Sequence, residues 1–290
     1  MAETDYEIFV DAAADISPAV AKENNIKFIP MEYSLGDEMR KSTFMEDHDT
    51  LKKFYNGQRS GALTKTTQIS PFMYTEIIEP SLKAGKPVLY LSLSGGLSNT
   101  YQSAMLAKAE LGEKYPDVPF IPIDTLSATG GIGVLAERAI RNRQDGCGIW
   151  ENAADISEAT HRIRHWFLVQ DLMYLKRGGR IGGAAAMVGT MLNVRPILKI
   201  DENGKLVNFA KKRGNKQAVA EILAKYAETA DPASKDPVYV IDADDEELGS
   251  ELDSELRKAY PGLTIRRCVL CPIIGAHTGP GMAAVCHLGR

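Results

Sequence analysis

The sequence is poor in cysteine and tryptophan, and it contains no long hydrophobic run. Its four cysteines among 290 residues are too few for the disulfide framework of a small secreted protein. The longest nearly apolar stretch, Ile181 to Leu192, is well short of the roughly 20 residues that cross a bilayer. No signal peptide is visible before the first strand-like segment. Together these absences predict a reduced, cytoplasmic protein that makes at most transient contact with a membrane.

The sequence also lacks an excess of positive charge. It has 34 lysines and arginines against 38 aspartates and glutamates, which gives a formal net charge of −4. A general nucleic-acid binder needs a basic surface that displaces phosphate counterions, so this class is excluded. With 44% hydrophobic and 25% charged residues, the composition is typical of a globular protein with a sizeable core. The length suits one large domain or two modest ones.

Strands alternate with helices through the first half of the sequence. Tyr6–Val10 and Val88–Leu93 have the composition of buried strands, and Pro18–Asn24 and Leu97–Tyr115 have helical patterns that follow them. This alternation is typical of an α/β fold with a mainly parallel sheet. Ser70-Pro71 has the residue types of a helix N-cap followed by the first helical position.

The second half contains the strongest hairpin signal. Asp201-Glu-Asn-Gly204 separates two strand candidates, Arg195–Ile200 and Lys205–Ala210, and the Asn-Gly pair is typical of a tight turn between antiparallel strands. Further helices and strands follow it. We therefore divide the chain into two α/β domains, residues 1–155 and 156–290.

Cysteine and glycine motifs offer two candidate sites. Cys268 and Cys271 have CxxC spacing, with His277 and His287 downstream. In an extended segment, residues three apart point to opposite faces, so we expect inert thiols and no metal site. Gly130–Gly133 follows a strand and opens a helix, where a phosphate can bind. It lacks the spacing of dinucleotide-binding and P-loop motifs, and close helix–strand packing explains the glycines equally well.

Two clusters of hydroxyl side chains lie at predicted strand ends. Thr64–Pro71 and Ser92–Thr100 each precede a helix, and ligands of open α/β sheets bind outside the carboxyl ends of strands. The two clusters therefore predict an anion site with uncharged donors. The alternative is that serines such as Ser70 and Ser98 only cap helices.

Three further features can likewise be interpreted either as a binding site or as ordinary structure. His277 lies in a Gly- and Pro-rich segment that predicts a short turn between two strands, where glycines let a ligand approach closely. The basic segments Lys176–Arg180 and Lys211–Gly214 predict either a patch for an anion or a protein partner, or a solvated face.

Several segments in fixed order together resemble one family. The segments are Phe9–Ile16, Thr66-Thr-Gln-Ile-Ser70, Leu93-Ser-Gly-Gly-Leu-Ser-Asn-Thr-Tyr-Gln102, Asp171–Ile181, Leu192–Leu198 and Gly275-Ala-His-Thr-Gly-Pro-Gly281. Their succession is similar to that of the DegV family, bacterial fatty-acid-binding proteins that include the substrate-binding subunits of fatty acid kinase. The resemblance covers nearly the whole chain.

The resemblance implies a two-domain α/β fold of the DegV (EDD) type, with a mainly parallel sheet in the N-terminal domain and a mixed sheet in the C-terminal domain. One long-chain fatty acid would lie between the domains, with its carboxylate held at positions that correspond to Thr66, Ser94 and His277. Gly95 stands where the family has a second serine. A backbone N–H at Gly95 or Gly96 would then replace that hydroxyl.

The resemblance also implies partners. Arg180 and Arg213 match two arginines that serve the interaction with a separate kinase subunit. The chain would be a monomeric binding protein without a cofactor and would not itself be an enzyme. An autonomous phosphotransferase or hydrolase that uses the same Ser, Thr and His residues is the alternative. For the apolar tunnel we name Phe72, Met73, Met187, Met191 and Ile197, although such residues also form ordinary cores.

Overall fold

The computed structural model describes residues 4–43, 46–182 and 193–290. Its first sheet has the strand order β2-β1-β6-β7, and all neighbouring strands are parallel. The strands are β1 (Glu7–Asp11), β2 (Lys27–Ile29), β6 (Val88–Ser92) and β7 (Phe120–Asp124). Every residue of β6 is buried, as a central parallel strand requires. The prediction of a parallel sheet in the first half is confirmed.

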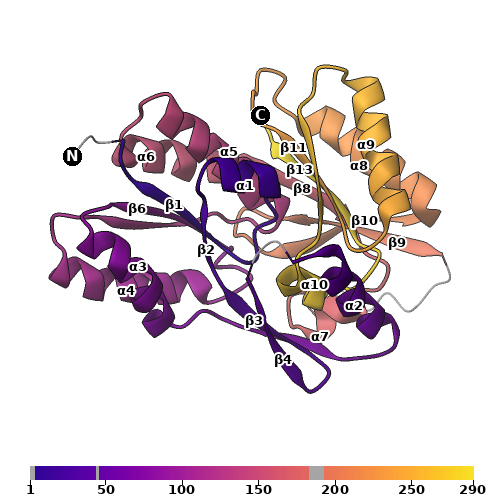
Figure 1. Ribbon diagram of the computed structural model, residues 1–290. Coiled ribbons are helices and arrows are strands. Elements are labelled where there is room, and N and C mark those ends of the chain that lie inside the picture. The colour runs from indigo at the N-terminus through magenta and orange to yellow at the C-terminus, as the bar shows by residue number, and fades with distance from the viewer. Residues whose placement is uncertain (1–3, 44–45, 183–192) are drawn as a thin grey trace.

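Helices cover both faces of this sheet. They are α1 (Pro18–Glu23), α3 (Pro71–Lys83), α4 (Thr100–Lys114), α5 (Gly130–Gln144) and α6 (Ile149–Thr160). Helices α3 and α4 lie together on one side, whereas α5 and α6 lie on the other (Figure 1). Ser70 caps α3, because its side chain accepts a hydrogen bond from the backbone N–H of Met73. Helix α6 crosses the boundary that we placed at residue 155, so that division stays a prediction.

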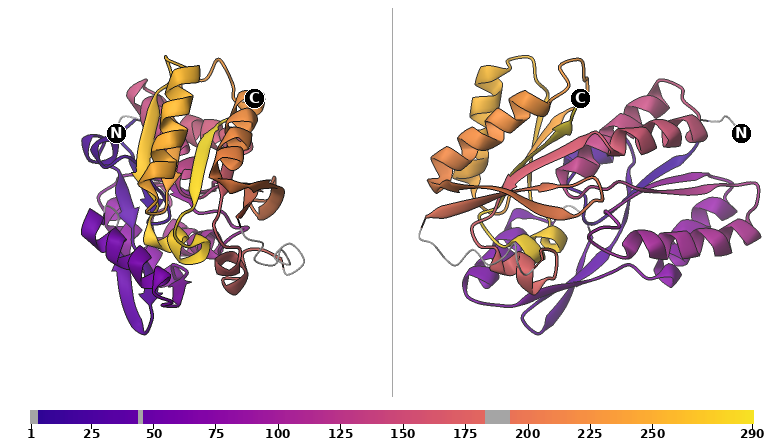
Figure 2. Two further views of the ribbon diagram at one scale, coloured as in Figure 1. Left: turned by 90° about the vertical axis from the view of Figure 1, so that its right-hand side faces the viewer. Right: turned by 180° about the vertical axis from the view of Figure 1, so that it is seen from behind.

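The second sheet is mixed and has the order β10-β9-β8-β13-β11-β12. Its strands are β8 (Ile163–Leu168), β9 (Val194–Ile200), β10 (Leu206–Arg213), β11 (Val238–Asp242), β12 (Ile265–Val269) and β13 (Ala283–Leu288). Strands β9 and β10 form the predicted hairpin. Helices α8 (Gly214–Thr229) and α9 (Glu246–Ala259) pack on its outer face (Figure 2).

Helix α5 lies between the two large sheets. It contacts β1 and β6 of the first sheet and β8, β11 and β13 of the second. Its glycines permit this fit, because a Cβ at Gly130 would lie 2.6 Å from the Cβ of Tyr239, and one at Gly133 would lie 2.6 Å from the backbone oxygen of Asp15. Close packing therefore accounts for the glycine-rich segment.

A third, small sheet was not expected from the sequence. It has the order β4-β3-β5 and is accompanied by three helices from distant parts of the chain. These elements are β3 (Met31–Leu35), β4 (Glu38–Ser42), β5 (Thr64–Thr67), α2 (His48–Arg59), α7 (Met173–Arg177) and α10 (Pro272–Thr278). His277 therefore lies in the last turn of a helix and not in a turn between strands. Pro272 begins that helix, and Gly279, with a φ of 75°, follows its end.

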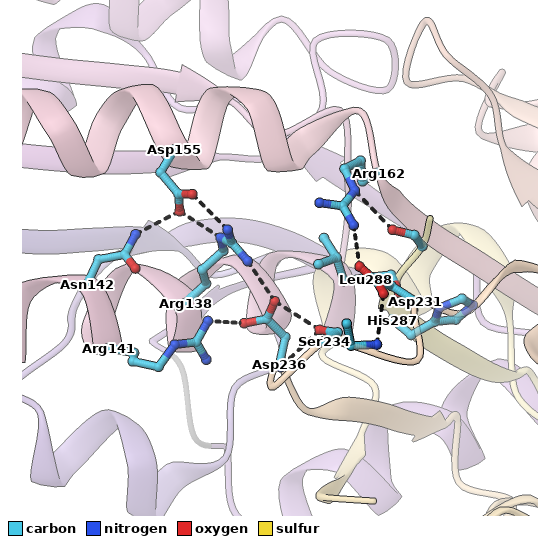
Figure 3. Close-up of polar contacts among 12 residues, drawn as sticks. Arg138, Arg141, Asn142, Asp155, Arg162, Asp231, Ser234, Asp236, His287 and Leu288 are labelled. Carbon is cyan, nitrogen blue, oxygen red and sulfur yellow. Dashed lines mark hydrogen bonds and ion pairs between the residues drawn. The ribbon is translucent and has the colours of Figure 1, made fainter. Parts of the chain in front are cut away.

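An ion network joins the two large units (Figure 3). Arg138 on α5 bonds Asp155 on α6 and Asp236 before β11, and Arg141 also reaches Asp236. The side chain of Asp236 is only 1% exposed, so it depends on these two arginines. The contacts fix α5 and α6 against the second sheet.

Candidate functional site

A narrow cavity lies where the three sheets meet. The empty space within it, including the part open to solvent, is about 700 Å³. The enclosed part of the cavity is slender. The lining residues are Met31, Thr66, Leu93, Leu97, Ser98, Ala128, Thr129, His165, Phe167, Leu175, Arg180, Ile200, Leu206, Ile273, Ile274, His277, Thr278, Met282, Ala284 and Cys286.

Thr66 and His277 meet in the wall of this cavity. Strand β5 presents the threonine and α10 the histidine, and the threonine Oγ1 lies 2.8 Å from Nε2 of the imidazole. A neutral imidazole carries one N–H and threonine one O–H, and the bond between them uses one of these two protons. With the proton on Nε2, the imidazole donates to the threonine and the Thr66 O–H stays free for another group. With the proton on Nδ1, the remaining donor is that buried nitrogen, which lies against Gly178.

Burial keeps His277 uncharged. Desolvation, followed by the nearby positive charge of Arg180, lowers the pKa of the imidazole to about 4. Its Nδ1 is buried and has no hydrogen-bond partner among the described residues. A Cβ added at Gly178 would lie 2.3 Å from this nitrogen, so the absence of a side chain at Gly178 makes room for the ring.

Arg180 provides a positive charge at the same cavity. Its Nε donates to the backbone oxygen of Leu97 at 3.1 Å, and its Nη1 donates to that of Gly178. No carboxylate of the described residues pairs with it, and desolvation lowers its pKa. A half-buried guanidinium with only neutral partners is suited to an incoming anion.

Ser94 and Gly95 do not line the cavity. The hydroxyl of Ser94 is fully buried, donates to the backbone oxygen of Gly204 at 2.8 Å and accepts from the N–H of Gly96. The N–H of Gly95 donates to the carboxylate of Asp124 at 3.1 Å. The loop thus supports the turn of the β9–β10 hairpin. The structure brings Thr66 and His277 together, but it does not bring Ser94 or Gly95 to them.

Ser98 lines the cavity instead. The sequence left open whether Ser98 belongs to an anion site or caps a helix. Its Oγ accepts the N–H of Thr100, the first residue of α4, and lies 2.8 Å from the Thr100 hydroxyl. The helix N-cap position itself belongs to Asn99. The signal for Ser98 was its place in the hydroxyl cluster before this helix, but the sequence could not show which serine faces the cavity.

The described residues that we predicted for the apolar tunnel do not line the cavity. Phe72 is 69% exposed on the first turn of α3, and Met73 packs against the core without reaching the cavity. Ile197 faces the core beneath α8, because alternate residues of β9 point to opposite sides of the sheet. None of these three lines the cavity. Met187 and Met191 lie outside the described residues.

The second predicted arginine lies elsewhere. Arg213 ends β10 with an exposed side chain and does not line the cavity, and no contact of the described residues joins it to Arg180. His165, which the sequence gave no reason to single out, is a lining residue. Within the described part of the chain, no cluster of three metal-ligating side chains is present. Nor is any described helix both long and apolar enough to cross a membrane.

The comparisons agree with one another. The family described as "Uncharacterised protein, DegV family" matches residues 5–290. The DegV domain-containing protein CPE0026 of Clostridium perfringens is 33% identical over 284 residues, which are 98% of this chain and 97% of that protein. Protein TM841 of Thermotoga maritima, described as revealing a fatty-acid-binding function, is 29% identical with a TM-score of 0.85, covering 99% of both chains.

A third comparison concerns a DegV family protein from Thermus thermophilus whose structure is described in terms of fatty acid binding. It is 27% identical, has a TM-score of 0.86, and covers 99% of this chain and 100% of its own. The sequence motifs, the arrangement of the sheets and the full-length match lead to one conclusion. The chain belongs to the DegV family.

Proposed function

We propose that this protein binds one long-chain fatty acid in the cavity, with the carboxylate at Thr66, His277 and Arg180. The observation that carries the proposal is the spare donor of the Thr66–His277 pair beside a guanidinium that has no carboxylate partner in the described structure. Both groups border a slender, mainly apolar cavity. Ser98 is a further hydroxyl donor within the same wall. The fatty-acid-binding descriptions of the Thermotoga and Thermus relatives support this choice of ligand.

The energetics favour an alkyl chain as the source of affinity. A palmitate tail has about 14 methylenes, each worth about 0.8 kcal/mol on leaving water, which sets a ceiling of about 11 kcal/mol. Ordering the chain and losing its free motion consume part of this. Submicromolar binding remains within reach, provided that hydrogen bonds satisfy the buried carboxylate. The donors at Thr66 and Arg180 meet that condition.

We propose further that the bound carboxylate is presented to a separate ATP-dependent fatty acid kinase, which forms the acyl phosphate. The sequence motifs shared with kinase substrate-binding subunits support this role. In this reaction the chain holds the acceptor oxygen in place, and the positive charge of Arg180 favours the approach of a phosphoryl group. Arg213 is the second candidate contact for the kinase.

The Thr66–His277 pair also has the spacing of a nucleophile and its base, which favours an autonomous hydrolase as the second candidate. In hydrolytic triads a third group, usually a carboxylate, orients the base through its other nitrogen. Nδ1 of His277 faces Gly178 and has no such partner among the described residues. The binding function is therefore the better supported of the two.

A substitution at Thr66 tests the proposal. Thr66→Val keeps the shape of the side chain and removes its hydroxyl, and a hydrogen bond to a charged group contributes about 1.5–3 kcal/mol. We expect palmitate to bind the delipidated variant at least about tenfold more weakly, as measured by calorimetric titration. Thr67→Val is the matched control, because this exposed neighbour points away from the cavity. Equal losses in both variants, or no palmitate binding by the wild type, would contradict the proposal.

The kinase role needs its own assay. Addition of a bacterial fatty acid kinase catalytic subunit and ATP to the palmitate-loaded protein should produce acyl phosphate, detected as its hydroxamate. Release of product from ester substrates without any partner protein would instead support the hydrolase.

A further inference from the structure

The wall of the cavity contains a polar atom that the proposed carboxylate site does not use. His165 lies on β8 beside Cys286 on β13, and both residues line the cavity. The imidazole is 3% exposed. Its Nδ1 has no hydrogen-bond partner among the described residues and exposes less than 1 Å². One residue that lines the mainly apolar cavity thus carries an unsatisfied nitrogen.

His165 is remote from the carboxylate site. Strand β8 ends at Leu168, and from there the chain runs to α7 and Arg180. His165 lies three residues before that end, which at about 3.3 Å per residue is about 10 Å further along the sheet. Phe167, which lies between His165 and Leu168 on this strand, also lines the cavity. A ligand held by its carboxylate at Thr66 would therefore bring the middle or far part of its tail to His165.

The contacts of the ring determine what kind of group Nδ1 can bind. Nε2 lies 3.3 Å from the backbone oxygen of Ala128, which can only accept, so Nε2 carries the proton. Burial lowers the pKa of His165 to about 3, and the ring is neutral at physiological pH. Nδ1 is consequently an acceptor without a hydrogen. It can bind an O–H group but not a carbonyl oxygen.

There is also an irregularity in the sheet beside this histidine. Strands β8 and β9 pair only through Phe167 with Leu198 and Leu168 with Ile197, and the pairing does not extend to His165 and Ile200. A second cavity, lined in part by His161 and Lys199, borders both of these residues. The wall is therefore not closed by backbone hydrogen bonds where a substituent on the tail would lie.

We propose that the cavity is adapted to hydroxy fatty acids, with Nδ1 of His165 accepting a hydrogen bond from a hydroxyl in the middle or far part of the chain. The proposal rests on the fatty-acid binding proposed above and specifies its ligand. The side chain of Thr129 also lines the cavity, but its hydroxyl already donates to the carboxylate of Asp15. His165 is the side chain that the ligand hydroxyl satisfies.

The test compares ligands of equal length on the delipidated protein. Calorimetric titrations with stearate, 3-hydroxystearate, 10-hydroxystearate, 12-hydroxystearate and 10-oxostearate are made on the wild type, on His165→Phe and on His287→Phe. His287 is the matched control, a buried histidine on the adjoining strand whose side chain does not line the cavity. We expect the wild type to bind a 10- or 12-hydroxy acid at least about tenfold more tightly than the 10-oxo acid. 3-Hydroxystearate gains nothing over stearate.

His165→Phe should lose this preference, taken as the ratio of hydroxy-acid to oxo-acid affinity within each variant, and His287→Phe should keep it. Equal binding of hydroxy and oxo acids by the wild type overturns the inference, as does an unchanged preference in His165→Phe. If His165→Phe does not fold, the ¹⁵N signal of Nδ1 in the wild type decides, because it should shift on binding 10-hydroxystearate and not on binding stearate. Absence of stearate binding would overturn the proposed function itself, whereas stearate binding without discrimination overturns only this inference.

Discussion

Gly178→Ala should weaken fatty-acid binding although it removes no polar group. A Cβ at this position would lie 2.3 Å from Nδ1 of His277, whereas ordinary contacts begin at 3.4 Å, so the two must separate by about 1 Å. The imidazole has no room to retreat, because Nε2, on the other side of the ring, meets Thr66 at 2.8 Å. The ring must turn, and its bond to Thr66 breaks.

The size of the effect follows from that bond. Loss of a hydrogen bond between neutral groups costs about 1 kcal/mol of folding stability, and overpacking adds about 1 kcal/mol or more. Once the imidazole turns, it no longer orients the Thr66 hydroxyl. Loss of the hydrogen bond from that hydroxyl to the ligand carboxylate costs about 1.5–3 kcal/mol, which corresponds to about 10- to 100-fold in affinity. The backbone of Gly178 has a φ of −72°, so alanine introduces no backbone strain there.

The assay is palmitate titration of the delipidated variant, together with urea unfolding. Gly182→Ala is the matched control in the same loop, because a Cβ there has no neighbour within 4 Å among the described residues. We expect Gly182→Ala to bind as the wild type does. If Gly178→Ala binds palmitate as tightly as Gly182→Ala, the argument that His277 is held in position by packing is refuted.

Two further predictions concern stability. Burial raises the pKa of Asp15 to about 7, so its ionisation destabilises the fold as the pH rises from about 4 to 7. Asp15→Asn imitates the protonated acid and does not ionise. The difference in unfolding free energy between this variant and the wild type should therefore grow in favour of the variant by up to about 4 kcal/mol across this pH window. A difference that stays constant with pH in urea unfolding would contradict the assigned pKa. Asp236→Asn removes the buried partner of Arg138 and Arg141 and should cost about 2–3 kcal/mol. Asp253→Asn, in an exposed pair within one helix, should cost far less, and similar losses would refute the role given to the network.

Local patterns in the sequence were enough to predict the first sheet and the hairpin. A continuous apolar strand such as β6 and an Asn-Gly turn depend on neighbours within a few residues. The small third sheet could not be predicted in this way. Its strand β5 and helix α10 are joined by contacts between residues more than 200 positions apart, such as the bond between Thr66 and His277.

The residues of the candidate site were also predictable only in part. Thr66 and His277 were named from their motifs, and the structure brings them together. Ser94 was named equally well, but its hydroxyl serves the hairpin turn, because only the folded chain places Gly204 beside it. Apolar lining residues were the least predictable. Ile197 and Ile200 on β9 have the same side chain, yet Ile197 packs in the core beneath α8 and Ile200 lines the cavity. Nothing in their chemistry separates a cavity wall from a core.

The contact between Ser94 and Gly204 has a consequence for variation within the family. The two residues are 110 positions apart, and a side chain at Gly204 would place its Cβ 2.1 Å from the Ser94 hydroxyl. The length of the β9–β10 turn therefore depends on its contact with the loop that carries Ser94, as well as on the geometry of the turn itself. Homologues that lengthen or shorten this turn should carry a compensating change at the positions of Ser94 and Gly96, so the two segments should covary in an alignment.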